Sequence, residues 1–177
     1  RRAQAMLVKR LMILLPVLNE AEGLDIVLRT IPSESLIELG WEPNIVIVDG
    51  KSTDDSQQIA IDAGCTVLVQ PSRGKGEAVR VGFDYAVKNH FDAVVMFDAD
   101  LTYDPLDMLP MLQQLEPESV VVGNRLSHSL AQDAMSPVNW IGNHLLTWSA
   151  VILHGTEIHD VCSGYWLFDR KALMRMN

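Results

Sequence analysis

Residues 94–105 read Val-Val-Met-Phe-Asp-Ala-Asp-Leu-Thr-Tyr-Asp-Pro, an apolar run that ends abruptly in two carboxylates one residue apart. The run is short and rich in β-branched and aromatic residues, so it predicts a buried strand of a parallel sheet. Asp104 and Pro105 are the residue types of a helix N-cap and a first helical position. Asp98 and Asp100 are therefore expected at the carboxyl end of a central strand, the edge at which open α/β sheets bind their ligands.

Two carboxylates this close in the chain would repel one another unless a cation lies between them. Oxygen ligands favour a hard ion, Mg²⁺ or Mn²⁺, and such ions commonly keep water and bind substrate phosphates. We therefore predict that Asp98 and Asp100 hold a divalent metal beside a diphosphate. The alternative is that they are two unrelated acids in a solvated loop, and their place at a strand end counts against it.

The composition of the 177 residues suits one globular domain with a sizeable core. The formal net charge of −9 counts against a nucleic-acid binder that relies on broad electrostatic attraction. Cys65 and Cys162 lie far apart and in no metal-binding spacing, so they are expected to be reduced core thiols, which favours a cytoplasmic location. No stretch reaches the roughly 18 uninterrupted apolar residues of a membrane span.

Apolar strand patterns and amphipathic helical patterns alternate along the first 125 residues. Strands are expected at 11–17, 44–49, 66–69, 94–97 and 120–122, and helices at 21–30, 33–39, 53–63, 77–89 and 105–115. This alternation predicts an α/β fold with a mainly parallel sheet. Three strands end in polar residues at the same edge, namely Asn19-Glu20, Asp49 and Asp98-Ala-Asp100. Their convergence indicates a ligand site more strongly than any one of them does.

The phosphate-binding signals in the sequence are weak. Neither Gly-X-Gly-X-X-Gly nor Gly-X4-Gly-Lys-Ser/Thr follows the first strand. Residues 73–76, Arg-Gly-Lys-Gly, precede a predicted helix and can present backbone donors and a cation to an anion. The equally weighted alternative for this segment is a flexible turn at a helix start.

Ser136-Pro137 begins a strongly apolar helical pattern that carries Trp140 and Trp148. One interpretation is a core helix packed against the sheet. The other is an interfacial helix, because two tryptophans on one apolar helix suit a membrane boundary. The basic residues that would attract anionic lipid are absent from this segment.

Five short motifs occur in a fixed order: Pro16-Val-Leu-Asn-Glu20, Ile47-Val-Asp49 with Ser52-Thr-Asp54, Arg73-Gly-Lys-Gly76, Asp98-Ala-Asp100 and Gly123-Asn-Arg125. As an ordered set they resemble the inverting, nucleotide-sugar-dependent glycosyltransferases of the GT-A fold, family 2. Within that family the chain is most similar to the polyprenyl-phosphate hexosyltransferases of the dolichol-phosphate mannose or glucose synthase type. The resemblance covers nearly the whole chain and implies a Rossmann-like GT-A sheet flanked by helices.

The resemblance implies a role for each matching residue on the donor side. Pro16, Asn19 and Glu20 would line the nucleotide pocket. Asp49 would bind the base or ribose, and Lys75 would lie near the base or the diphosphate. Asp98 would contact the ribose and the metal, and Asp100 would ligate the divalent cation that bridges the diphosphate of a GDP-mannose or UDP-glucose type of donor.

On the acceptor side, the resemblance implies that Arg125 faces the phosphate of a polyprenyl phosphate. The segment Cys162-Ser-Gly-Tyr-Trp166, with Asp160 just before it, would build that side of the sugar pocket. An ionised acceptor phosphate needs no general base. If the acceptor were a hydroxyl, a base would be required, and Asp160 would be the candidate.

The chain departs from the family pattern at several positions. Many relatives have Asp-Asp-Gly-Ser where this chain has Asp49-Gly-Lys-Ser52, and Thr102 stands where a glutamine often ligates the metal. A second arginine for the acceptor phosphate is replaced near Asn143. We expect residues 1–177 to be a single catalytic domain that lacks a C-terminal acceptor or membrane-associated part, located in the cytoplasm at a membrane face.

Two alternatives to polyprenyl-phosphate transfer remain open at this point. One is a soluble glycosyltransferase that acts on a small phosphorylated or hydroxyl acceptor such as a glycerate. The other is a GT-A domain that binds nucleotide sugars without turnover, which the departures at Lys51, Thr102 and Asn143 allow. The retained Asp98, Asp100 and Arg125 count against this last alternative.

Overall fold

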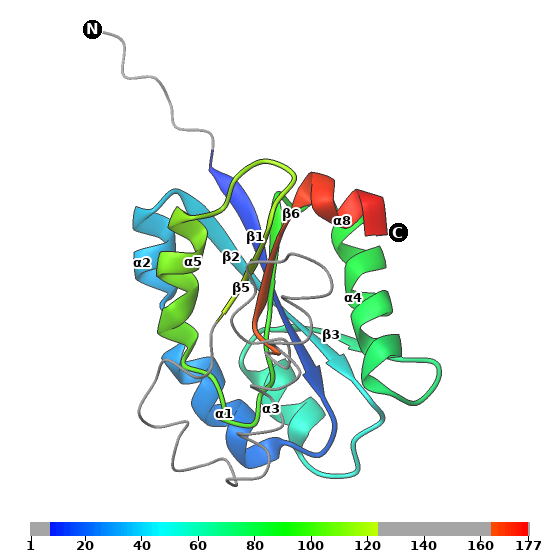
Figure 1. Cartoon of the computed structure of the whole chain (residues 1–177). Coiled ribbons are helices and arrows are strands. Elements are labelled where there is room, and N and C mark those ends of the chain that lie inside the picture. The colour runs from blue at the N-terminus through cyan, green and yellow to red at the C-terminus, as the bar shows by residue number, and fades with distance from the viewer. Residues whose placement is uncertain (1–7, 124–163, 177) are drawn as a thin grey trace, which may run out of the picture.

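The computed structural model describes residues 8–123 and 164–176. These residues form a six-stranded sheet in the order β3-β2-β1-β4-β6-β5, with helices on both faces (Figure 1). The strands are β1 (Lys9–Val17), β2 (Trp41–Asp49), β3 (Thr66–Val69), β4 (Ala93–Met96), β5 (Val120–Val122) and β6 (Trp166–Asp169). The helices are α1 (Ala21–Thr30), α2 (Ser33–Glu38), α3 (Ser56–Asp62), α4 (Lys75–Lys88), the 3-10 turn η1 (Pro105–Asp107), α5 (Met108–Gln113) and α8 (Arg170–Met176).

Strands β1 to β4 are parallel, which confirms the predicted α/β class and the mainly parallel sheet. The chain runs outward from β1 through β2 to β3 and then returns to place β4 on the other side of β1. Such a reversal of strand order leaves a crevice outside the carboxyl ends of the two central strands. The pairing of β1 with β4 stops at Leu14 and Met96, whereas its pairing with β2 continues to Val17 and Asp49. The two central strands therefore separate at their carboxyl ends.

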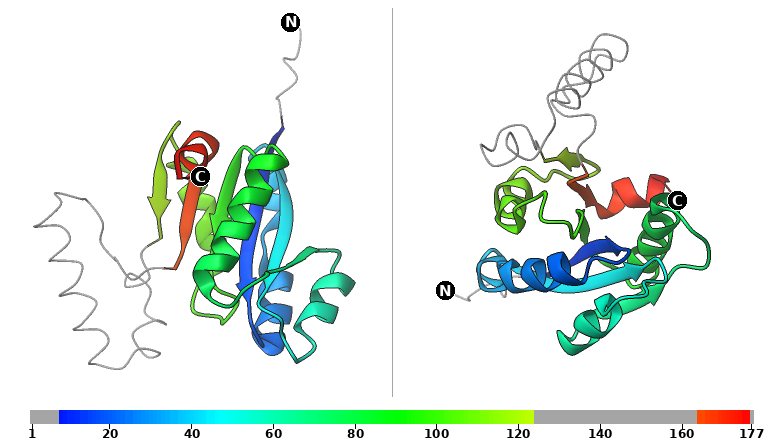
Figure 2. Two further views of the ribbon diagram at one scale, coloured as in Figure 1. Left: turned by 90° about the vertical axis from the view of Figure 1, so that its right-hand side faces the viewer. Right: turned by 90° about the horizontal axis from the view of Figure 1, so that it is seen from below.

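The central strands are buried on both faces, as their uninterrupted apolar runs predict. In β1, Leu11, Ile13 and Leu15 belong to the core layer beneath α1, α2, α3 and α5. Met12 and Leu14 belong to the opposite layer, beneath α4 and α8. Figures 1 and 2 show these two helical layers on either side of the sheet. Strand alternation thus fixes which face each helix covers.

Helix boundaries show where tertiary contacts override local signals. Helix α3 begins at Ser56, not at the predicted Thr53, and the Thr53 amide donates to the side chain of Asn19 in another loop, at 2.8 Å. The segment predicted as one helix over 105–115 is η1 followed by α5. The predicted cap is confirmed, since the Leu106 amide donates to Asp104 Oδ1 at 2.9 Å.

Strand β6 was not predicted. It lies between β4 and β5 and runs antiparallel to both, and Figure 2 shows it beside β5. Leu167 and Phe168 are buried in opposite core layers, so this short strand completes the core on both faces. In the described ranges no helix is long and apolar enough to cross a membrane, and the apolar segment that starts at Ser136 lies outside those ranges.

Candidate nucleotide and metal site

The carboxylate pair lies where the sequence predicts it, directly after β4. Lys75 Nζ lies 2.6 Å from Oδ1 and 2.7 Å from Oδ2 of Asp98, so strand end and helix start meet in an ion pair. Asp100 is exposed, and its Oδ1 accepts a hydrogen bond from the Thr102 amide at 3.0 Å. The start of α4 and the carboxylate pair therefore belong to one site.

Glu20, at the end of the β1 loop, lies in the field of the same acids. Partial burial raises the pKa of its carboxyl group, and the negative charges of Asp100, Asp54 and Asp98 raise it further. Three stretches that are far apart in sequence thus place acidic groups near one another at the carboxyl edge of the sheet. A cation bound there would relieve this repulsion.

The loops after β1 and β2 are joined by hydrogen bonds. The Asn19 amide donates to Ser52 Oγ at 2.9 Å, and Asn19 Oδ1 accepts from the Thr53 amide at 2.8 Å. Asn19 has a positive φ of 56°, a conformation that asparagine tolerates better than most residues. The side chain of Asn19, predicted to line the nucleotide pocket, also fastens these two loops together.

The same loop after β2 serves the first turn of α1. The Glu20 amide donates to Ser56 Oγ at 3.0 Å, and the Ala21 amide donates to Asp54 Oδ2 at 3.1 Å. Hydrogen bonds from the Ser56 hydroxyl, the Ser56 amide and the Ala21 amide lower the pKa of Asp54. Unpaired amides at the helix start are thus satisfied from another loop. The Ser52-Thr-Asp54 motif alone did not indicate this positioning role.

Asp49 lies at the end of β2 and is completely buried. Its Oδ2 accepts hydrogen bonds from the Lys51 amide at 2.8 Å, the Ser52 amide at 3.1 Å and Gln57 Nε2 at 2.6 Å. The carboxylate therefore holds the turn after β2 in shape. Contact between Asp49 and a nucleotide base stays a prediction. Pro16 is half-buried in β1 opposite Val48, beyond the last residue of β1 paired with β4.

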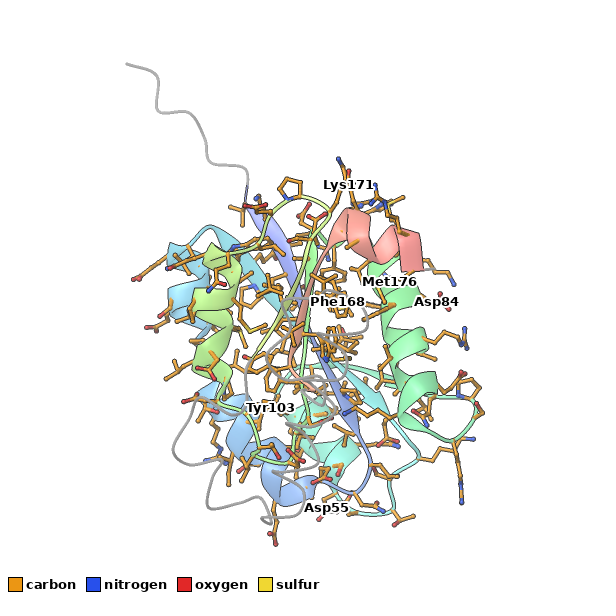
Figure 3. All side chains as sticks on the ribbon, in the orientation of Figure 1. Asp55, Asp84, Tyr103, Phe168, Lys171 and Met176 are labelled. Atoms are coloured by element: carbon orange, nitrogen blue, oxygen red, sulfur yellow. The ribbon has the colours of Figure 1, made fainter. Side chains whose placement is uncertain are left out.

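Two glycines allow close approaches around the carboxylate pair. A Cβ at Gly23 of α1 would lie 2.3 Å from the carbonyl oxygen of Ala99. A Cβ at Gly164 would lie 2.8 Å from Asp98 Oδ2, and the Gly164 amide donates to the hydroxyl of Tyr103. These contacts, which sequence patterns did not predict, join segments more than 60 residues apart around the carboxylate pair. Figure 3 shows Tyr103 at the end of the molecule where Asp55 lies, opposite Lys171.

The donor set at this edge fits a divalent ion that shares its shell with a ligand. No group of three or more His, Cys, Asp or Glu side chains within residues 8–123 and 164–176 is arranged to hold a metal on its own. Asp98 and Asp100 supply carboxylate oxygens, and Mg²⁺ is commonly held by one or two carboxylates together with water and substrate phosphates. The predicted acceptor-side residues Arg125 and Asp160 lie outside the described residues.

The match to a known family decides the assignment of the chain. Residues 12–176 match the family model described as Glycosyl transferase family 2. The chain belongs to glycosyl transferase family 2. This confirms the resemblance drawn from the ordered motifs, and the mostly parallel six-stranded sheet flanked by helices is the GT-A arrangement expected of a family 2 member.

Similar proteins include Glycosyltransferase AglJ of Haloferax volcanii, 36% identical over 167 residues, which cover 93% of this chain and 52% of the relative. Undecaprenyl-phosphate mannosyltransferase of Micrococcus luteus is 25% identical over 175 residues, which cover 93% of this chain and 68% of that protein. The chain spans about half the length of the first of these relatives.

Solved structures with the same fold include glucosyl-3-phosphoglycerate synthase from Mycobacterium tuberculosis in complex with UDP. The TM-score is 0.67 at 23% identity, and the match covers 92% of this chain and 57% of that one. The same synthase has also been solved with Mn²⁺, UDP and phosphoglyceric acid, with a TM-score of 0.65 at 23% identity and coverage of 92% and 56%. These similarities confirm the fold.

Proposed function

We propose that this protein is an inverting glycosyltransferase that transfers a hexose from a nucleotide diphosphate sugar, of the GDP-mannose or UDP-glucose type, to a polyprenyl phosphate. The observation that carries the proposal is the position of Asp98 and Asp100 after β4, where the strand order of the sheet reverses. Lys75 forms an ion pair with Asp98 there. Membership of glycosyl transferase family 2 supports the reaction class. The name of the Micrococcus luteus relative supports the acceptor class.

The proposed cofactor is Mg²⁺ or Mn²⁺, held by Asp98 and Asp100. Structures of the same fold that contain Mn²⁺ with UDP, or Mg²⁺ with UDP, support this choice. When bound, such an ion acts as a Lewis acid for the departing nucleoside diphosphate. The exposed carboxylate of Asp100 is available to the ion, whereas Asp98 must share its oxygens with Lys75.

The other donor-side residues bind and orient the nucleotide in this proposal. Pro16, Asn19 and Glu20 would line the pocket along the separated end of β1, and Asp49 would hold its floor in shape. Lys75 begins α4, where its ammonium and the helix amides face an incoming anion. Its positive charge offsets part of the negative charge that the diphosphate brings to an edge already rich in acids.

The acceptor phosphate supplies its own nucleophile, since it is ionised near neutral pH and requires no general base. It must approach a negatively charged donor, and we propose that the guanidinium of Arg125 offsets this repulsion. An acceptor hydroxyl would instead need Asp160 as its base. A lipid acceptor requires the protein to work at a membrane surface, and we propose that this is the cytoplasmic face.

A second candidate function is transfer to a small phosphorylated acceptor. The observation in its favour is the fold similarity to glucosyl-3-phosphoglycerate synthase, with a TM-score of 0.67. Both candidates use the same donor site and differ only in the acceptor.

A transfer assay distinguishes these reactions. GDP-[¹⁴C]mannose and UDP-[¹⁴C]glucose are each incubated with undecaprenyl phosphate, dolichyl phosphate or 3-phosphoglycerate, with Mn²⁺, Mg²⁺ or EDTA. The proposal predicts label in the lipid extract that depends on the metal and is lost in Asp100→Asn but kept in the control Asp55→Asn. Label on phosphoglycerate alone would establish the second candidate. Metal-dependent donor binding with no transfer to any acceptor would indicate a non-catalytic domain.

A further inference from the structure

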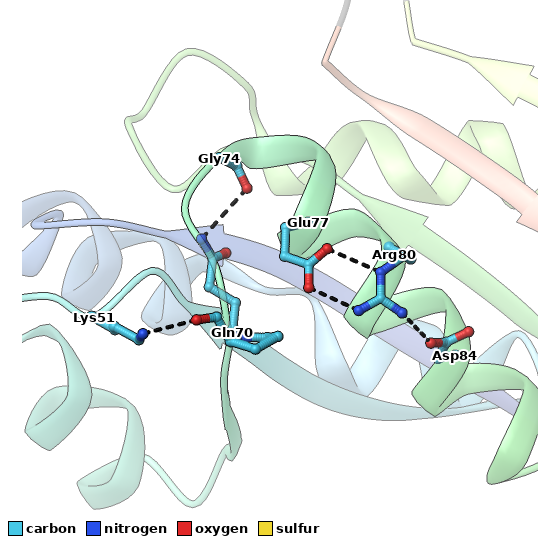
Figure 4. Close-up of polar contacts among 7 residues, drawn as sticks. Lys51, Gln70, Gly74, Glu77, Arg80 and Asp84 are labelled. Atoms are coloured by element: carbon cyan, nitrogen blue, oxygen red, sulfur yellow. Dashed lines mark hydrogen bonds and ion pairs between the residues drawn. The ribbon is translucent and has the colours of Figure 1, made fainter.

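The loops after β2 and β3 meet at the edge of the candidate site. Lys51 Nζ donates a hydrogen bond to the carbonyl oxygen of Pro71 at 2.9 Å (Figure 4). Next to this contact, the Gln70 amide donates to the Asp49 carbonyl oxygen at 3.0 Å, and the Gln70 side chain is buried. The Lys51 side chain is therefore held at a defined place, although the residue itself is exposed.

The backbone of Lys51 is strained. Its φ is +66°, a region that glycine enters freely and that a side chain with a Cβ disfavours. The buried carboxylate of Asp49 enforces this conformation by accepting the Lys51 amide at 2.8 Å. Strained backbone of this kind concentrates at functional sites, where the surrounding structure maintains it. Here the strain presents a lysine side chain at the ligand edge of the sheet.

The position of Lys51 along that edge matches the base end of a nucleotide. If the diphosphate lies at the end of β4 and the rest of the nucleotide runs across β1 toward β2, the base reaches the end of β2, which is about 10 Å away at the usual strand spacing. There the exposed Leu18 lies against the turn before Lys51, since a Cβ at Gly50 would be 3.3 Å from Leu18 Cδ1. An apolar surface for the face of a base and a donor for its edge therefore lie side by side.

We propose that Lys51 reads the base of the sugar donor and selects bases that present a carbonyl oxygen. An ammonium group donates hydrogen bonds and accepts none. Uracil and guanine offer a carbonyl oxygen at the position where cytosine and adenine carry an amino group. An amino group facing Lys51 would leave donors opposed to one another, and sites built for a hydrogen bond discriminate strongly in this way. This inference rests on the proposed function and assigns to Lys51 the selection of its uracil or guanine donor.

The proposal also changes the roles expected of Asp49 and Lys51 in the turn after β2. Asp49 was predicted to touch the base or ribose, but its carboxylate is buried and engaged within the turn. In this arrangement Asp49 is a positioning residue, and Lys51 is the side chain that faces the ligand. The amino acid at position 51, which departs from the family pattern, thereby becomes the specificity determinant.

The test is equilibrium binding of UDP, GDP, CDP and ADP to the full chain in the presence of Mn²⁺, measured by calorimetry. The wild-type protein should bind UDP and GDP about tenfold or more tightly than CDP and ADP. Lys51→Met should reduce that preference to about threefold or less, mainly because the protein binds UDP and GDP more weakly. Lys51→Arg keeps a charged donor and should restore part of the preference. Lys88→Met, at the far end of α4, is the matched control and should keep the wild-type preference.

A further variant, Lys51→Gly, distinguishes recognition of the base by Lys51 from a purely structural role of its hydrogen bond to Pro71. Glycine relieves the strained φ, so the melting temperature should hold or rise while the base preference is lost. A lower melting temperature together with an equal loss of affinity for all four nucleotides would overturn the proposal. A base preference that survives Lys51→Met would overturn it as well and would leave the proposed function standing. If the wild-type protein binds none of the four nucleotides, both proposals fail.

Discussion

The ammonium of Lys75 lies 2.6 Å from Oδ1 and 2.7 Å from Oδ2 of Asp98, so one lysine spans both oxygens of a proposed metal-binding carboxylate. About half of the lysine side chain and a quarter of the aspartate side chain are exposed, with fractions of 53% and 27%. Such a pair contributes little to folding, on the order of 0–1 kcal/mol. Its significance is that lysine and metal compete for the same oxygens.

Lys75→Met should therefore have opposite effects on two ligands. Mn²⁺ alone should bind about fivefold more tightly, which corresponds to the loss of a partly exposed ion pair. UDP or GDP with Mn²⁺ should bind about tenfold more weakly, because the diphosphate loses a charged hydrogen-bond donor. Calorimetric titrations of the metal alone and of the metal with nucleotide measure both effects. A parallel change in the two affinities would show that Lys75 does not compete with the metal for Asp98.

Asp100→Asn should leave the fold intact, because Asp100 is exposed and its described hydrogen bond is to the nearby Thr102 amide. The affinity for nucleotide with Mn²⁺ should fall about tenfold or more, since a neutral amide is a poor ligand for a hard cation. Asp55→Asn is the control, because Asp55, labelled at the lower end of the molecule in Figure 3, is an exposed acid whose side chain makes no capping hydrogen bond. Equal losses in the two variants would assign the effect to general electrostatics.

Gly164→Ala should disturb Asp98 directly. The added Cβ would lie 2.8 Å from Asp98 Oδ2 and 3.1 Å from the Tyr103 hydroxyl, so one of these side chains must move. Overpacking of this kind costs about 1–3 kcal/mol of unfolding free energy, and metal affinity should fall with it. Gly76→Ala in α4 is the matched control, because its Cβ would meet no heavy atom within 4 Å apart from its chain neighbours and the backbone of its own helix, and the substitution favours the helix. Chemical unfolding and Mn²⁺ titration on both variants provide the comparison.

Asp54→Asn should lower the melting temperature near neutral pH. The ionised carboxylate accepts hydrogen bonds from Ser56 Oγ at 2.6 Å and from the Ala21 amide at 3.1 Å, and these bonds lower its pKa from the ordinary 3.8. A lowered pKa in the folded state contributes stability above the unfolded value, and that contribution is lost as the pH falls through the folded value. The difference between wild type and variant should therefore shrink below pH 3.8. A difference that is constant from neutral to acidic pH would contradict this coupling.

Sequence patterns predicted the parts of the fold that depend on local chemistry. The β4 run is continuous and apolar because the strand is buried on both faces, and this pattern places Asp98 and Asp100 correctly at its end. Strand β6 escaped prediction because its four residues carry no periodic signal and pair only with strands distant in the sequence. The start of α3 was placed three residues too early, in a loop whose Thr53 amide bonds to Asn19 in another loop, a contact that the local sequence does not indicate.

Some features of the candidate site could likewise be predicted from the sequence, and others depend on tertiary contacts. Strand-end acids can be predicted because parallel strands bring their carboxyl ends to one edge. The partnership of Lys75 with Asp98 joins residues 23 apart and depends on how α4 packs against the sheet. The burial of Asp49 could not be foreseen, because an acid at a strand end can point outward to a ligand or inward to its own turn. Lys51 was visible only as a departure from the family pattern, and its positive φ is a tertiary fact.

Binding of a nucleoside diphosphate through a divalent ion at Asp98 and Asp100 is tested most directly by calorimetric titration of UDP and GDP, first with Mn²⁺ and then with EDTA. We expect the affinity for at least one of the two nucleotides to be about tenfold or more higher with the metal, because the carboxylates and the diphosphate repel one another without it. Equal affinity in Mn²⁺ and in EDTA for every nucleotide that binds would contradict the metal site, and with it the proposed mechanism of transfer.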